Sequence, residues 1–298
     1  MRTLWVILAA LGLMALALTH LGRWVPLGDA AAVIRPHVLV LSAPVIVGLW
    51  LARLRPTMWL VVAAVSASGV STWRDLSGRW DVDARSDFVL YQKNLLWNVV
   101  SIDAVAQDIL QSGADIVTLQ EVSALNEELL QILAETHPHH RTCLSAGNGG
   151  IAILSRFPME ASPIDCTSGE GLILARVALP DKRLVWVGAV HLNWPYPFDQ
   201  ARQLPSVVAG LSSLDGDVIV AGDFNMVPWG SSVRQIAEAA RGERVGGYYS
   251  TFPGFGPFAP LAIDHVIIPD RARGWVDVRP RYGSDHHGLL AEFSLPAS

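Results

Sequence analysis

The first 72 residues contain three apolar segments that hold no charged side chain. They occupy residues 4–19, 38–52 and 57–70. Each is close to the length of about 17–20 residues that a membrane-spanning helix needs. None shows the polar face that a helix on the surface of a soluble core presents to water. We therefore expect about three transmembrane helices within residues 1–72, rather than three buried core helices.

Basic residues at the ends of these segments indicate an orientation. Arg53 and Arg55 form a compact turn between the second and third segments, and short basic loops favour the cytoplasm. We expect a multi-pass membrane protein whose larger, C-terminal part lies on the extracytoplasmic side. Arg2 and the sequence Ala15-Leu16-Ala17, which resembles a cleavage site, also fit a cleaved signal peptide, which is the alternative for the first segment.

The chain becomes polar after the third segment. We expect a linker over residues 73–86 and a catalytic domain over residues 87–298. Residues 73–298 carry 17 Lys and Arg against 26 Asp and Glu, a formal charge of −9. An acidic domain repels nucleic acid unless cations intervene. Short apolar runs alternate with amphipathic ones, which predicts an α/β domain with mixed sheets.

Polar side chains follow several of the predicted strands directly, where α/β proteins place their functional sites. A lone acid at such a position is more often a turn former than a ligand, but here several occur together. Carboxylates suit Mg²⁺ or Mn²⁺, amides can hold a phosphoryl oxygen, and histidines can donate to a phosphate. Asp264 could also orient His286 and stabilise its imidazolium. The candidates are Asn94, Glu121, His191, Asp223, Asn225, Asp264, Asp285 and His286.

The order of these motifs resembles the endonuclease/exonuclease/phosphatase family. The match covers roughly residues 87–294 and rests on the following motifs: Asn94, LQE ending at Glu121, GGIAILSR at 149–156, Val190-His191-Leu192, GDFN at 222–225, IDH at 263–265 and SDH at 284–286. The resemblance implies a four-layer sandwich of two mixed β-sheets flanked by helices. It also implies hydrolysis of phosphodiesters or phosphomonoesters that depends on Mg²⁺.

The resemblance also implies a role for each candidate. Glu121 is expected as the principal metal ligand with Asn94 beside it, and Asp285 at a second metal position. Asp223 is expected to align or deprotonate the attacking water, and Asn225 to hold that water or the phosphate.

The two histidines of the set are expected at the phosphate. His286 would contact the scissile phosphate with Asp264 as its partner. His191 would be a further phosphate contact.

Two departures weaken a DNA-repair function. Leu96 stands where such members pair the first Asn with an acid, and the region His137–His140 offers no tyrosine. We expect the latter region to be a solvated turn rather than a transition-metal site. The sequence thus predicts a membrane-anchored phosphoesterase. A nuclease acting on DNA or RNA is the nearest alternative. A catalytically silent membrane scaffold is the alternative from another class, although no site residue is missing.

Overall fold

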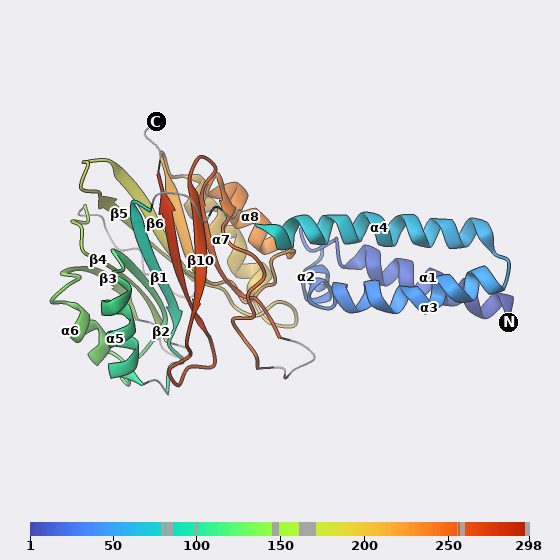
Figure 1. Ribbon diagram of the computed structural model, residues 1–298, viewed down its shortest axis with the longest axis horizontal. Coiled ribbons are helices and arrows are strands. Elements are labelled where there is room, and N and C mark those ends of the chain that lie inside the picture. The colour runs from blue at the N-terminus through green and yellow to red at the C-terminus, as the bar shows by residue number, and fades with distance from the viewer. Residues whose placement is uncertain are drawn as a thin grey trace.

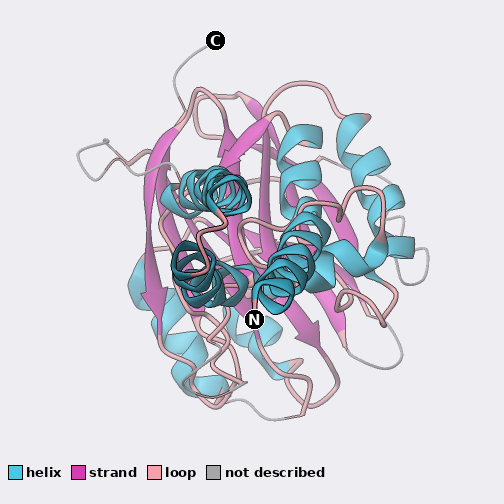
Figure 2. Cartoon of the chain, turned by 90° about the vertical axis from the view of Figure 1, so that its right-hand side faces the viewer, coloured by secondary structure: helices cyan, strands magenta, loops and turns pink. Residues whose placement is uncertain are grey.

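The computed structural model shows a helical shaft attached to an α/β body (Figure 1). It describes residues 1–298 except 79–80, 82–85, 99–100, 145–148, 161–170, 255, 257–259 and 296–298. The shaft consists of α1 (Arg2–Leu18), α2 (Pro26–Val33), α3 (Arg35–Leu51) and α4 (Arg55–Ser77). Viewed along the shaft, these helices lie in front of the strands of the body (Figure 2).

The body contains two mixed β-sheets. In the first, the strand order is β10-β11-β1-β2-β4-β3, and in the second it is β5-β6-β7-β9-β8. The pairs β1–β2 and β6–β7 are parallel, and the other neighbours are antiparallel. The bounds are β1 (Phe88–Asn94), β2 (Ile116–Val122), β3 (His139–Cys143), β4 (Gly150–Ser155), β5 (Leu172–Ala178), β6 (Leu184–His191), β7 (Val218–Asp223), β8 (Gly242–Arg244), β9 (Asp264–Pro269), β10 (Arg273–Arg279) and β11 (Gly288–Ser294).

Three apolar clusters separate four layers. One fills the space between the two sheets with residues of both, such as Leu90 and Ile219. A second joins the six-stranded sheet to α5 (Ile102–Ser112) and α6 (Glu128–Leu133). A third joins the five-stranded sheet to α7 (Gln200–Ser212) and α8 (Ser231–Ala239). Sheets that are buried on both faces account for the short, continuously apolar strands of the sequence. The predicted arrangement of two mixed sheets flanked by helices is confirmed.

One local prediction was wrong, and α6 begins after a turn. The Asn126 side chain closes this turn by accepting from the Ser123 backbone N–H at 2.8 Å. The helix starts only at Glu128. The histidine-rich region is no solvated turn. His137 is fully buried with Nε2 at 2.9 Å from the Ala114 carbonyl oxygen, and His139 begins β3.

The helical shaft packs into the core of the body. Ala32 of α2 belongs to the cluster beneath α7 and α8, and Leu76 of α4 packs against it. The Trp229 indole N–H donates to the Ala32 carbonyl oxygen at 2.7 Å, and Arg244 donates to the carbonyl oxygens of Asp75 and Leu76. α4 therefore continues past residue 72, the predicted end of the membrane region, and reaches the body as one helix.

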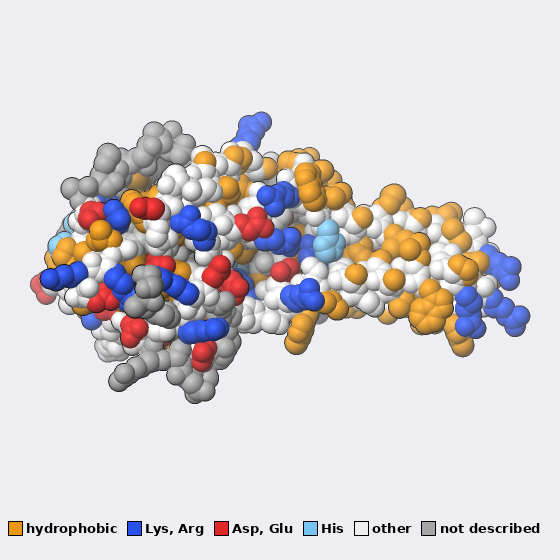
Figure 3. Space-filling view, turned by 90° about the horizontal axis from the view of Figure 1, so that it is seen from above, with side chains coloured by type: hydrophobic (Ala, Val, Ile, Leu, Met, Phe, Trp, Pro, Cys, Tyr) orange, Lys and Arg blue, Asp and Glu red, His pale blue; other side chains and the backbone are white. Residues whose placement is uncertain are grey.

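Apolar side chains cover the surface of the shaft (Figure 3). Val40 is 73% exposed and Trp59 is 62% exposed. Arg2 at the start of α1, and Arg53 and Arg55 at the turn before α4, lie at the free end of the shaft, where α1 and α4 begin (Figure 1). Among the described residues, no single helix has both the length and the apolar composition to cross a membrane. α2 and α3 together meet that requirement but are bent by 70°. Membrane spanning stays a prediction.

Cys143 at the end of β3 is disulfide-bonded. Cys166, the other cysteine of the chain, lies outside the described residues.

Candidate active site

The ends of neighbouring strands bring the predicted site residues together. Asn94 ends β1, His191 ends β6 and Asp223 ends β7. β9 pairs with β7 in a register that sets Asp264 directly opposite Asp223. Because β1 and β2 are parallel, as are β6 and β7, their carboxyl ends lie at the same edge of the two stacked sheets.

Glu121 occupies a bulge of β2. The pairing of β2 with β4 shifts between Gln120 and Val122, and Glu121 has a φ of 58°, in the left-handed region that few side chains adopt. Gly149 makes this bulge possible, since a Cβ on it would lie 2.6 Å from the Glu121 backbone. The bulge turns the Glu121 side chain toward the end of β1.

Asn94 links the two sheets at this edge. Its Nδ2 donates to Glu121 Oε1 at 3.1 Å and to Asp223 Oδ2 at 3.0 Å. The second carboxylate oxygen of Glu121 accepts from the Trp97 backbone N–H at 3.1 Å. Asp223 Oδ1 accepts from the Asn225 N–H at 2.8 Å. Both carboxylates are thus fixed by neighbours. Burial raises the pKa of each above its ordinary value.

Asp264 and His286 form a buried pair beside Asp223. His286 Nδ1 lies 2.8 Å from Asp264 Oδ2, and its Nε2 lies 3.6 Å from Asp223 Oδ2. Burial alone would lower the pKa of His286, but the carboxylates of Asp264 and Asp223 outweigh it and raise that pKa to about 10. At neutral pH the imidazole therefore carries a proton on each ring nitrogen.

His191 completes the edge from the other side. Its Nε2 lies 3.7 Å from Glu121 Oε1 and 3.8 Å from Asp223 Oδ2. Burial and the positive charge of His286 lower its pKa to about 4. His191 is thus a neutral imidazole at neutral pH, in contrast to His286.

The two remaining candidates present unpaired oxygen atoms. Asn225 donates from Nδ2 to the Leu192 carbonyl oxygen at 2.7 Å. Its Oδ1 is buried without a hydrogen-bond partner among the described residues, and so is Oδ1 of Asp285. Buried acceptors without a donor are costly, so such atoms mark a place for a ligand.

These side chains line a cavity of about 380 Å³. Its acidic and imidazole groups are Glu121, Asp199, Asp223, Asp285, His191 and His286, and its apolar wall includes Trp194 and Phe252. The Phe252 ring lies 4.9 Å from that of His286 between ring centres. The cavity therefore combines hard oxygen ligands, an imidazolium donor and a water-excluding wall.

The residues present fit a divalent cation. Carboxylate and amide oxygens are the ligands that Mg²⁺ prefers, and Glu121, Asp285 and Asn225 all bring such atoms to the cavity. Asp223, Asp264 and His286 also place possible ligand atoms within 4.8 Å of one another. The His286 ring, however, is bonded to Asp264 and positively charged, which disfavours it as a ligand.

Comparison with known proteins agrees with this geometry. Residues 85–286 match the model of the "Endonuclease/Exonuclease/phosphatase family". The chain belongs to this family. It is therefore a hydrolase of phosphate ester bonds with a buried cluster of acids and histidine. A comparison with curated proteins finds no match.

Solved structures share the fold. An endonuclease/exonuclease/phosphatase from Beutenbergia cavernae is 18% identical, with a TM-score of 0.56 and 71% of this chain and 72% of that chain covered. Sphingomyelinase C from Streptomyces griseocarneus is 17% identical (TM-score 0.52; 69% and 98% covered). A variant beta toxin from Staphylococcus aureus with bound magnesium ions is 16% identical (TM-score 0.54; 70% and 99% covered).

Sequence reasoning missed the polar residues beneath the site. Gln92 Nε2 donates to Asp264 Oδ1 and to Gln120 Oε1, each at 2.8 Å. Lys93 Nζ donates to the His286 carbonyl oxygen at 2.7 Å. Gln92 lies two residues before Asn94 and so on the same face of β1. This spacing of two polar residues within an apolar strand could have indicated from the sequence that Gln92 belongs to the site.

Two further histidines next to site residues are structural. His265 is buried with its Nε2 at 2.7 Å from the Met226 carbonyl oxygen, and His287 bonds through Nδ1 to the Arg279 carbonyl oxygen. Because side chains alternate along extended backbone, each points away from its catalytic neighbour.

Proposed function

We propose that this chain is a membrane-anchored, Mg²⁺-dependent phosphoesterase that hydrolyses a phosphodiester or phosphomonoester by attack of water. The observation that supports this most strongly is the convergence of Glu121, Asp223 and His286 on one cavity. A pair of fixed carboxylates beside an imidazolium is suited to activating water and stabilising the charge that develops on phosphate.

Glu121, Asn94 and Asp285 would hold the cation. Asn94 now donates from its amide nitrogen to Glu121 and Asp223, so it would have to turn its amide over to offer an oxygen. Oδ1 of Asp285 already lacks a partner among the described residues. A bound Mg²⁺ supplies Lewis-acid polarisation of the phosphoryl oxygen and lowers the pKa of water.

The remaining residues act on the water, the phosphate and the proton. Asp223, held by Asn94 and by the Asn225 N–H, would accept a proton from the attacking water. His286 would donate from Nε2 to the phosphate, and Asp264 keeps its Nδ1 side bonded. His191 and Asn225 line the cavity near Asp223 and would position the phosphate.

The shaft supports membrane anchoring. Its surface exposes large apolar side chains such as Val40, Leu41 and Trp59, an arrangement that lipid tails would cover. The basic groups at its free end would lie in the cytoplasm and the body outside. The disulfide at Cys143 agrees with an extracytoplasmic body, since disulfides persist there.

Hydrolysis of bis(p-nitrophenyl) phosphate by the full chain in mild detergent tests the proposal. We expect turnover with Mg²⁺, loss of turnover with EDTA and recovery when Mg²⁺ is added back. Glu121→Gln should lower kcat/KM by about 10³-fold, because several kcal/mol of metal-dependent stabilisation are lost. Glu128→Gln, an exposed change in α6, should stay within twofold of the wild type. A folded preparation without metal-dependent turnover of any phosphate ester would end the proposal.

A further inference from the structure

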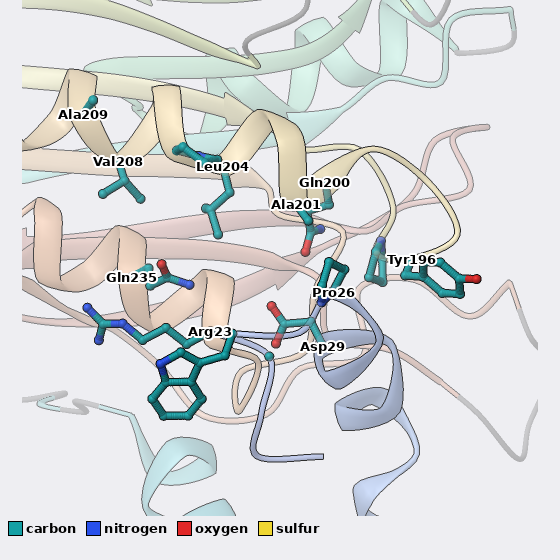
Figure 4. A pocket seen from close by; sticks show the side chains of 14 residues that line it. Arg23, Pro26, Asp29, Tyr196, Gln200, Ala201, Leu204, Val208, Ala209 and Gln235 are labelled. Atoms are coloured by element: carbon teal, nitrogen blue, oxygen red, sulfur yellow. The ribbon is translucent and has the colours of Figure 1, made fainter. Parts of the chain in front are cut away.

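A second cavity lies where the shaft meets the body, and Figure 4 shows it from close by. This junction cavity measures about 460 Å³. One wall is the outer face of α7, with Ala201, Leu204 and Val208 pointing toward the cavity. The opposite side is formed by the segment between α1 and α2 and by α8 (Figure 4).

One loop separates the junction cavity from the catalytic cavity. Pro195 and Tyr196 line the junction cavity, whereas their neighbours Trp194 and Pro197 line the catalytic cavity. Gln200 anchors this loop, since its Nε2 donates to the carbonyl oxygens of Asn193 at 2.7 Å and Phe224 at 3.1 Å. A molecule that reaches across residues 194–197 would therefore touch both cavities.

The charged groups around the junction cavity already have protein partners. Arg23 Nη1 lies 3.3 Å from Glu238 Oε2. The Asp29 carboxylate accepts from the N–H groups of Ser231 and Ser232 at the start of α8. What the cavity offers to a ligand is thus mainly the apolar face of α7 and the rings of Trp24 and Tyr196, which are 73% and 54% exposed.

We propose that the junction cavity binds the apolar chain of an amphiphilic phosphate ester whose phosphate lies in the catalytic cavity. The inference rests on the proposed function and names its substrate class. The common loop joins the two sites. The apolar lining matches a hydrocarbon chain, and burying such a chain favours binding in proportion to its length. The cavity also lies at the base of the apolar shaft, where a lipid would enter from the side.

Esters of one chromophore with different alkyl chains test this inference. The full chain in mild detergent, at fixed detergent concentration, is assayed with ethyl, octyl and dodecyl p-nitrophenyl phosphate. Ala201→Trp places a bulky ring in the junction cavity from an exposed position on α7. Arg202→Trp adds the same ring to the same helix at a side chain that is 87% exposed and lines neither cavity.

We expect kcat/KM of the wild type and of Arg202→Trp to rise at least tenfold from the ethyl to the dodecyl ester. Ala201→Trp should lose at least tenfold on the dodecyl ester and stay within twofold on the ethyl ester. Ala209→Trp, also on the cavity wall, repeats the test should Ala201→Trp fold poorly.

The possible failures are distinct. If the protein hydrolyses none of the esters, including the ethyl ester, both the proposed function and this inference are refuted. Hydrolysis with no preference for long chains, or a preference that the tryptophan variants at positions 201 and 209 leave intact, overturns the inference alone. The first result would point to a soluble phosphate ester as substrate, and the second would place the alkyl chain outside the junction cavity.

Discussion

Replacing Asp29 with alanine would break three hydrogen bonds between the shaft and the body. This carboxylate, on α2, caps α8 of the body. It accepts from the Ser231 N–H at 2.7 Å, the Ser231 hydroxyl at 2.9 Å and the Ser232 N–H at 3.2 Å. Gly22 leaves room for it, since a Cβ there would lie 2.1 Å from Asp29 Oδ1.

The size of the effect follows from these contacts. Loss of a capping acceptor costs about 1 kcal/mol. Loss of a negative charge near a partly buried helix N-terminus costs up to about 2 kcal/mol more. Asp29→Ala should therefore weaken the first turn of α8 by about 3 kcal/mol, while Asp29→Asn, which keeps an acceptor and loses only the charge, should lose up to about 2 kcal/mol.

Hydrogen exchange of the full chain in detergent measures the local stability of the first turn of α8. A loss of about 3 kcal/mol should speed exchange at the start of α8 by about 10²-fold in Asp29→Ala, with α5 unchanged as an internal reference. Gly22→Ala should act in the same direction. Unchanged exchange of α8 in Asp29→Ala would show that the Asp29 cap contributes nothing to the stability of α8.

Three further changes probe the site and its support. Asp264→Asn should lower kcat by about 10²- to 10³-fold, because the His286 imidazolium loses its carboxylate partner; a decrease below tenfold in steady-state assays would contradict this. Gln92→Leu should lower the free energy of unfolding by about 1–3 kcal/mol, since Asp264 and Gln120 lose a donor, and an unchanged urea midpoint would argue otherwise. Asp108 is buried, which raises its pKa, but hydrogen bonds from Arg279 and Tyr91 outweigh burial and hold the pKa below its ordinary value. Its stabilisation is thus complete above about pH 4 and lost as the pH falls through the lowered pKa, so unfolding midpoints of Asp108→Asn should depend less on acid than those of the wild type.

Much of the catalytic edge was predictable because its residues end or begin apolar strands. Asn94 and Asp223 each terminate a strand that is visible in the sequence, and Asp264 begins another. What brings them into contact is strand order, which local patterns do not encode. The pairing of Asp223 with Asp264 depends on β9 lying next to β7. This order of strands that are far apart in the sequence is determined by the burial of both sheets.

Other features were hidden for local reasons. β3 was missed because a run of three histidines and a proline at residues 137–140 does not show the apolar pattern of a strand, although β3 pairs with the next strand, β4. The bulge at Glu121 depends on Gly149, which the sequence places in a different motif. Docking of α2 was missed because its composition resembles that of the apolar segments around it, while its contacts are with residues near the other end of the chain, such as Trp229.

Ala32 and Leu76 of the shaft pack beneath α8. The change in composition after the shaft therefore does not mark a domain boundary in the folded chain. A shortened protein that starts at residue 87 would leave the Trp229 indole and the Arg244 guanidinium without the acceptors that α2 and α4 provide. It would also uncover apolar surface of the third cluster. Transfer of the body to another N-terminal segment, by an engineer or by recombination, would have to bring the end of α4 and all of α2 with it.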